Sequence, residues 1–110
     1  MLQQYRKRET LSMSSRSSDR KYRIFRAIVV RRDKVCVICG SRYRRSAHHI
    51  NSWKYFPLER YDTENGVTLC GGRGCHNAFH TMFKNSYREK ATKKDWLNFL
   101  DLVNYIKGLK

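Results

Sequence analysis

The sequence predicts a small α+β domain, and three observations support that class. One segment near each end of the chain has amphipathic helical spacing, whereas the middle holds two short β-like runs separated by turn residues. Four cysteines occur as two pairs around these runs. With 110 residues, the chain is expected to form one domain, near the lower size at which a core can be buried unaided.

The N-terminal part divides into a polar arm and a helix. Residues 1–18 are basic, Ser-rich and without periodicity, so we expect them to be largely disordered. From Asp19 to Arg32, apolar residues at helical spacing predict an amphipathic basic helix, with Ser18 or Asp19 as its N-cap. Four apolar residues are expected on its buried face: Ile24, Phe25, Ile28 and Val29.

The middle of the chain predicts two strands followed by a helix. The first strand is expected around Ala47 to Ile50, and the second at "VTLC", residues 67–70. Pro57 and Gly66 bracket a long polar loop between the strands. The segment "CHNAFHTMFKNS" that follows has helical spacing.

A C-terminal helix is expected over about residues 92–107. Thr92 and Asp95 resemble a capping box, and Gly108 is a suitable terminator. Four residues form its apolar stripe, which we expect to pack on the core: Trp96, Leu100, Val103 and Ile106.

The charge of the chain favours a polyanionic partner. Lysine and arginine outnumber aspartate and glutamate 24 to 9, giving a formal net charge of +15. Neutralisation of phosphates drives nucleic-acid binding, whereas a surface that serves only solubility normally mixes both signs. No apolar run is long enough to span a bilayer, and the N-terminus lacks the apolar region of a signal peptide. We therefore expect a cytoplasmic protein that binds nucleic acid and no membrane.

The cysteines have the spacing of a metal site. Two residues separate Cys36 from Cys39, and four residues, three of them glycine, separate Cys70 from Cys75. Four thiolates are a usual ligand set of structural zinc, and a small domain with few apolar residues needs such support. Disulfides are rare in the cytoplasm, and buried free thiols would make two clustered pairs a coincidence. The spacing predicts structural zinc.

All four histidines fall between the first cysteine pair and the helix that begins at the second. His76 and His80 are four residues apart on that helix, so both side chains leave one face and can meet at one ion. His48 and His49 are adjacent on the first strand and must point to opposite faces of the sheet. One of them could therefore join a metal while the other has a different role.

This part of the chain resembles the motif of the HNH endonucleases, whose fold is the ββα-metal motif. Three features match it in order and spacing: the pair "HH", Asn65 in "ENGVTLC" and the segment "CHNAFH". The resemblance covers about Cys36 to His80, and it is especially close to versions from bacteriophages and mobile elements, including homing endonucleases. It implies one nuclease domain over residues 19–110, with its core at 36–84 and helices flanking it on both sides.

The resemblance also implies residue roles. His49 would be the general base, oriented by Asn65 through its side-chain amide or the adjoining backbone. His48 and His76 would hold a catalytic divalent cation that stabilises charge on the phosphate and the leaving oxygen. His80 matches the third histidine ligand of the nuclease colicins; other members keep two protein ligands, and His80 would then pack or contact phosphate. Mg²⁺ or Mn²⁺ is expected, and Ni²⁺ or Zn²⁺ would also suit imidazole.

Basic and aromatic residues surround this motif. Four arginines are expected to contact phosphates, although each could equally be a solvated surface charge: Arg42, Arg44, Arg45 and Arg73. Three aromatic residues are expected to form core under the long loop or to stack on a base: Trp53, Tyr55 and Phe56. Arg60 is expected to reach Glu64 or Asp62, or to touch DNA.

The resemblance implies a metal-dependent endonuclease that hydrolyses phosphodiester bonds of double-stranded DNA, as a monomer or homodimer. A nicking or homing-type enzyme of a phage or mobile element is the first expectation, and a packaging-associated or restriction-like phage nuclease is the second. Charge and cysteines alone would also fit a non-catalytic, zinc-stabilised nucleic-acid-binding module or, with less support, a ribosomal-type RNA-binding protein.

Overall fold

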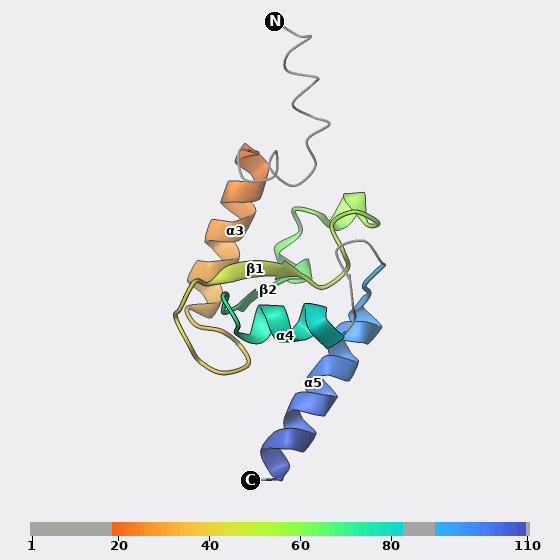
Figure 1. Ribbon diagram of the computed structural model, residues 1–110. Helices are drawn as coiled ribbons and strands as arrows, with labels where there is room; N and C mark the ends of the chain where they lie inside the picture. The colour runs from red at the N-terminus through yellow and green to blue at the C-terminus, as the bar shows by residue number, and fades with distance from the viewer. Residues whose placement is uncertain (1–18, 83–89, 110) are drawn as a thin grey trace, which may run out of the picture.

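The computed structural model describes residues 19–82 and 90–109 (Figure 1). The predicted arm, residues 1–18, and the end of the predicted core, residues 83 and 84, lie outside the described residues. The elements follow in the order α3 (Arg20–Asp33), β1 (Ser46–His49), 3-10 turns at Pro57–Glu59 and Thr63–Asn65, β2 (Gly66–Leu69), α4 (Cys75–Met82) and α5 (Lys93–Gly108). The α+β class is confirmed, and each described element lies close to its predicted bounds.

The two strands form an antiparallel sheet with helices on both faces (Figure 1). The register sets His49 opposite Gly66. His49 stacks on Phe25 of α3 with ring centroids 4.7 Å apart, whereas the ring of His48 lies 4.5 Å from that of Phe79 on α4. The adjacent histidines therefore point to opposite faces, as the alternation of a strand requires.

Both long helices begin at the predicted N-caps. The carboxylate of Asp19 accepts a hydrogen bond from the backbone N–H of Lys21 at 2.9 Å. At the start of α5, the backbone N–H of Thr92 donates to the carboxylate of Asp95 at 2.9 Å, completing a capping box. These side chains satisfy N–H groups that a helix leaves unpaired in its first turn.

The buried face of α3 is narrower than predicted. Phe25 and Val29 are buried, but Ile24 and Ile28 are 50% and 48% exposed, so the prediction was wrong for those two. The pairs form adjacent stripes about 100° apart around the helix, and only one can face the sheet. Gly66 allows this close packing, because a Cβ there would lie 2.6 Å from the ring of Phe25.

The C-terminal end of α3 is tied to β2. The carboxylate of Asp33 accepts hydrogen bonds from Nε of Arg32 at 2.8 Å and from the backbone N–H of Thr68 at 2.9 Å. Burial raises the pKa of Asp33, but the hydrogen bonds from Arg32 and Thr68 outweigh it and hold that pKa below its ordinary value. The ionised carboxylate therefore fixes α3 against the sheet.

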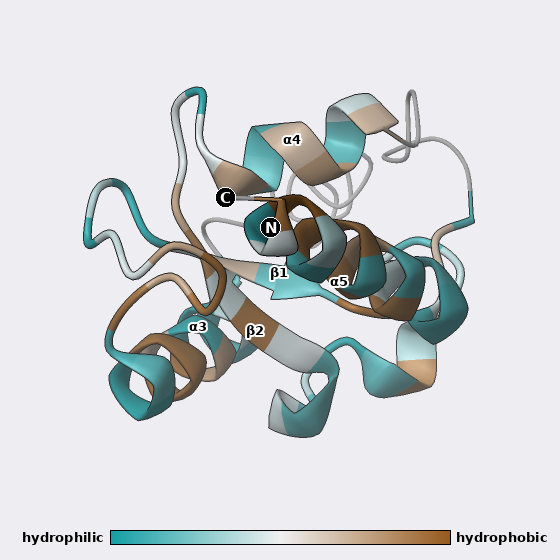
Figure 2. Cartoon of the chain, turned by 90° about the horizontal axis from the view of Figure 1, so that it is seen from below, coloured by the Kyte–Doolittle hydropathy of each residue, from teal (hydrophilic) through white to brown (hydrophobic). Residues whose placement is uncertain are grey.

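On the other face, α5 packs into the larger core together with residues of β2 and α4. Trp96 and Phe99 are buried, and Leu100 and Val103 pack partly against them. Ile106 is 47% exposed, so the predicted stripe was wrong at that end, and Phe99 was missed. Figure 2 shows teal and brown segments on both α3 and α5, in keeping with one exposed and one buried face. No described helix combines the length and apolar character needed to cross a bilayer.

Candidate metal centres and catalytic site

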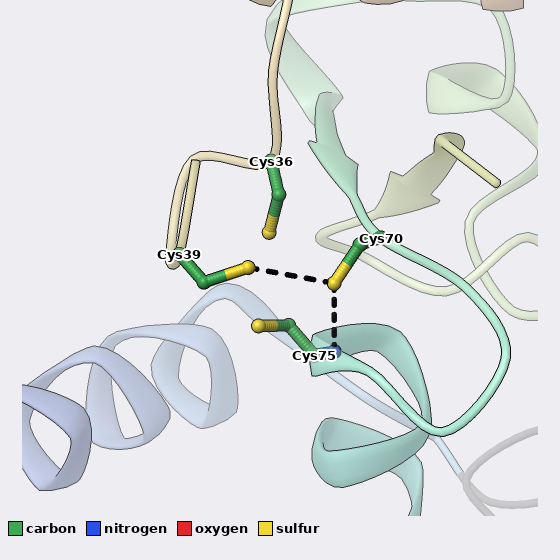
Figure 3. A group of neighbouring side chains, drawn as sticks. All are labelled: Cys36, Cys39, Cys70 and Cys75. Carbon is green, nitrogen blue, oxygen red and sulfur yellow. Dashed lines mark hydrogen bonds between the residues drawn. The ribbon is translucent and has the colours of Figure 1, made fainter. Parts of the chain in front are cut away.

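The four cysteines lie together at one end of the sheet, from the turn after α3, the end of β2 and the start of α4 (Figure 3). All four sulfur atoms lie within 4.8 Å of one another, and Sγ of Cys39 is 3.6 Å from Sγ of Cys70. A tetrahedral zinc ion bonded to sulfur places its thiolates about 3.8 Å apart. All four thiols are free, so the disulfide alternative is excluded in this structure. The cluster could hold a metal ion, consistent with structural zinc.

Backbone donors prepare this cluster for thiolate ligands. Burial raises the pKa of Cys36, but N–H groups of Cys39, Ile38 and Cys70 donate to its sulfur and lower that pKa to about 7. The backbone N–H of Cys75 donates to Sγ of Cys70 at 3.2 Å. Burial and the neighbouring sulfur of Cys36 raise the pKa of Cys75. Four thiolates this close together would need a cation to offset their charge, in keeping with a cluster that could hold a metal ion.

Three of the four histidines converge on the α4 face of the sheet. His48 projects from β1, and His76 and His80 project from α4, with one ring nitrogen from each lying within 4.8 Å of the others. The Nε2 atoms of His76 and His80 are 2.9 Å apart. The ring of His48 lies 5.3 Å and 5.6 Å from those two rings. The structure therefore brings together the predicted ligands, including His80, in a second group that could hold an ion.

The chemistry of this second group fits a cation. Nε2 of His48 is buried and has no hydrogen-bond partner among the described residues, which is costly for a polar atom unless an ion or water satisfies it. Burial, followed by the nearby His76, His80 and His49, holds the pKa of His48 well below its ordinary value. Burial and then His76 lower the pKa of His80 to about 4. Neutral imidazoles are the form that binds metal.

Two further residues orient the rings. Oγ of Ser46 lies 3.2 Å from Nδ1 of His76 and so fixes that ring through the nitrogen that does not face the other histidines. Phe79 and Trp96 pack against His48 at centroid distances of 4.5 Å and 5.5 Å. The sequence reasoning missed Ser46, although its position two residues before His48 on the strand places it on the same face.

Helix α4 joins the two groups. Its first residue, Cys75, belongs to the cysteine cluster, and the next, His76, belongs to the histidine cluster. The backbone N–H of His76 donates to the carbonyl of Cys70 at 3.1 Å. A Cβ on Gly74 would lie 2.4 Å from Sγ of Cys70, so the loop into the helix can pass this closely only with glycine. The geometry of one cluster is thus set partly by the other.

His49 belongs to neither cluster. Its Nε2 lies 2.9 Å from the backbone carbonyl of Arg60, and the residue is 7% exposed. Asn65, predicted to orient it, is buried and donates both amide protons to backbone carbonyls, of Asn51 at 3.0 Å and Glu59 at 3.2 Å. Its own carbonyl accepts from the N–H of Ile50 at 2.9 Å. The Asn65 side chain therefore ties together two parts of the loop between the strands.

The predicted arginines separate into two kinds. Arg42, Arg44 and Arg73 are exposed. Arg45 instead donates from Nη1 to the carbonyl of Lys34 at 2.7 Å, so its guanidinium holds the turn after α3. The prediction for Arg45 missed this structural use, because it depends on a residue eleven positions away.

The loop residues also differ from expectation. The guanidinium of Arg60 does not pair with Glu64 or Asp62; it donates from Nε to the carbonyl of Trp53 at 2.7 Å and lies 4.8 Å from the centre of that ring. Trp53 is partly buried beside His49, which fits the core alternative, whereas Tyr55 is 41% exposed.

Comparisons of the chain with family models, with curated proteins and with solved structures find no match.

Proposed function

We propose that the protein is a metal-dependent DNA endonuclease of the HNH type. The observation that carries the proposal is that two neighbouring histidines lie on opposite faces of the sheet in different surroundings. His48 points into a cluster of three imidazoles that could hold a cation, and its buried Nε2 lacks a partner among the described residues. His49 points to the opposite face and is hydrogen bonded to a backbone carbonyl. A motif that only bound nucleic acid would require neither arrangement.

Each group has a role in hydrolysis. A divalent cation held by His48, His76 and His80 would stabilise negative charge on the scissile phosphate and on the leaving oxygen. His49 accepts a proton from the attacking water as the water oxygen bonds to phosphorus. The phosphorus–oxygen bond to the departing sugar breaks, and that sugar oxygen takes a proton from solvent. Ser46 keeps His76 oriented during this step.

The ligand set favours some cations over others. The cluster consists of three imidazoles and no carboxylate among the described residues. Imidazole suits manganese, nickel, cobalt and zinc better than magnesium, which prefers oxygen ligands. We therefore expect Mn²⁺, Ni²⁺ or Zn²⁺ to bind this cluster more tightly than Mg²⁺.

The substrate proposed for this site is double-stranded DNA. A formal charge of +15 supplies a strong attraction to phosphates, and Arg42, Arg44 and Arg73 are exposed. One cluster of three histidines per chain predicts a nick in one strand, and a double-strand break would need two chains or two encounters. The proposal includes that this enzyme is encoded by a phage or a mobile element.

One observation favours a second candidate, a non-catalytic zinc-stabilised nucleic-acid-binding module. His49 is only 7% exposed and packs among aromatic rings, as a structural core histidine does. In that module the histidine cluster would serve stability, and the basic surface would bind nucleic acid without cutting it.

Plasmid nicking separates the two candidates. Supercoiled plasmid is incubated with the protein and Mn²⁺, Ni²⁺, Zn²⁺ or Mg²⁺, with and without a chelator, and DNA binding is measured in parallel. We expect conversion to the open circle, and about a 100-fold or greater loss of rate in His49→Ala with binding retained. Asn104→Ala, at an exposed position of α5, is the control and should cut like wild type.

Binding without strand scission under every cation would instead support the module. Sequencing the ends of cut DNA adds specificity to this result, because scattered ends would argue against a homing role whereas a recurrent site would support it.

A further inference from the structure

His49 lies in a box of aromatic side chains on the α3 face of the sheet. Its ring is stacked on Phe25, with centroids 4.7 Å apart and an interplanar angle of 12°. The ring of Trp53 meets it edge-on at 5.4 Å, and Tyr22 lies 6.3 Å away. These contacts leave the imidazole little freedom to tilt.

The hydrogen bond of His49 identifies its protonated nitrogen. Nε2 lies 2.9 Å from the backbone carbonyl of Arg60, and a carbonyl can only accept. Nε2 must therefore carry the proton, and in the neutral ring Nδ1 is the basic nitrogen. The position of one carbonyl thus determines which nitrogen can accept a proton.

The side chain of Arg60 fixes that carbonyl from a second direction. Its Nε donates to the carbonyl of Trp53 at 2.7 Å, and its guanidinium lies 4.8 Å from the centre of the Trp53 ring. A cation at this distance from an indole face is attracted by the ring. Arg60 therefore binds His49 through its backbone and holds, through its side chain, the tryptophan that packs against the same histidine.

The segment leading to Arg60 is anchored at both ends. The amide of Asn65 donates to the carbonyls of Asn51 and Glu59, and its oxygen accepts the N–H of Asn51 at 2.8 Å. Nδ2 of Asn51 donates to the Glu59 carboxylate at 2.9 Å. Residue 60 follows immediately, so the carbonyl that meets His49 extends from a fixed point.

We propose that Arg60 is a positioning residue for His49, acting through its clamp on Trp53. The clamp keeps the imidazole in the tautomer protonated at Nε2 and at a fixed tilt. The catalytic meaning of this role rests on the proposed function, in which His49 is the base; the tautomer and the order of the ring do not.

The test is Arg60→Met, which keeps the backbone carbonyl and removes both guanidinium contacts. Imidazole nitrogens of ¹⁵N-labelled protein are observed by NMR without DNA, at one pH at which the rings are neutral. Wild type should show His49 protonated at Nε2 alone, whereas Arg60→Met should show a mixture of tautomers and a more mobile ring. Arg60→Lys keeps a cation near Trp53 and should recover part of the wild-type pattern.

Kinetics supply the second readout. In Arg60→Met, kcat for nicking should fall about 10- to 100-fold with little change in KM. The reason is that a more mobile imidazole spends less time in the orientation that can take the proton of the attacking water. Arg31→Met removes an exposed arginine from α3 and should change neither the NMR pattern nor kcat.

The proposal is overturned if wild-type His49 carries its proton on Nδ1, or if a folded Arg60→Met keeps the wild-type tautomer and ring order. Should Arg60→Met not fold, the wild-type tautomer together with Arg60→Lys decides the question. A wild-type protein that cuts no DNA overturns the proposed function, while the NMR result still decides whether Arg60 positions His49.

Discussion

The two faces of the small sheet each hold one histidine, and they hold it by different means. On the α4 face, His48 is surrounded by other potential metal ligands and its buried Nε2 lacks a partner among the described residues. On the α3 face, His49 is stacked on Phe25 and hydrogen bonded to the carbonyl of Arg60. The first face has a group of side chains that could hold a cation, whereas the second is held together by contacts within the protein. Adjacent residues of one strand can thus serve two chemistries.

The faces also differ in what stabilises them. At one end of the sheet, the cysteine cluster joins the turn after α3, the residue that follows β2 and the start of α4. On the α3 face, Asp33 and the aromatic residues join α3 to the sheet by ordinary hydrogen bonding and packing. Removal of metal should therefore affect the faces unequally, and four predictions test this difference.

The largest effect is expected from the cysteine cluster. Cys70→Ser removes one of four ligands at a buried position next to β2, so the protein should lose zinc and its cooperative fold. Circular dichroism and the dispersion of amide NMR signals measure this loss. Val37→Ser, between Cys36 and Cys39 of the same cluster but at a position that is 45% exposed, should remain folded. A well-folded, zinc-free Cys70→Ser protein would show that the cluster is dispensable.

The next effect is expected from the histidine cluster. His76→Ala should bind one metal ion per chain fewer than wild type and lose nicking by about 100-fold or more, while thermal stability changes little because His76 is only partly buried. Metal content after gel filtration and melting temperature measure the two quantities. Asn77→Ala, the exposed neighbour on α4, should retain both metal ions. An unchanged metal count in His76→Ala would contradict the ligand assignment.

A smaller effect is expected on the α3 face. Asp33→Asn should lower the free energy of unfolding at pH 7 by about 1–2 kcal/mol, because the ionised acceptor for Arg32 and Thr68 is lost. The folded-state pKa of Asp33 is lowered, so its contribution is present above the unfolded pKa of about 3.9 and is lost as pH falls through the folded pKa. Urea denaturation from pH 7 to pH 3 should therefore show the difference between the two proteins shrinking as the pH falls.

The matched control for that experiment is Asp101→Asn, an exposed carboxylate on α5. It should change stability little at any pH. A constant difference between wild type and Asp33→Asn over the whole range would show that ionisation of Asp33 is irrelevant to α3 docking.

The smallest effect is expected from the residue that orients a ligand. Ser46→Ala removes the contact to Nδ1 of His76 and should weaken metal binding at the histidine cluster about 10-fold, with the cysteine cluster unchanged. Isothermal titration with Mn²⁺ measures the affinity. Ser52→Ala, which removes a buried hydroxyl without a partner among the described residues, should leave it unchanged. Equal affinities in wild type and Ser46→Ala would limit Ser46 to a packing role.

Spacing predicted the parts of the molecule that depend on near neighbours in the chain. Local geometry accounts for four of these features: the cysteine pairs, the i, i+4 histidines, the opposite faces of His48 and His49, and the Thr92–Asp95 cap. What the sequence could not decide was which of two adjacent stripes of α3 faces the sheet, since Ile24 and Phe25 are equally apolar. That choice depends on the position of Gly66 in space.

The missed contacts share this long-range character. Arg60 was expected to pair with a nearby carboxylate, yet its partner is Trp53, because the loop folds back on itself before reaching β2. Asn65 was expected to orient His49 through its side-chain amide or the adjoining backbone, and its amide protons go to carbonyls of that loop. Such contacts require the path of the loop, which no periodicity encodes.

Crystallographic location of a bound cation is the most direct test of whether His48 and His76 are metal ligands and His49 is not. A protein crystal soaked in Mn²⁺ should give an anomalous-scattering peak within bonding distance of His48 and His76 on the α4 face, with the ring of His49 unligated and still bonded to the Arg60 carbonyl. A peak at His49, or none among the three clustered imidazoles at saturating Mn²⁺, would contradict that assignment.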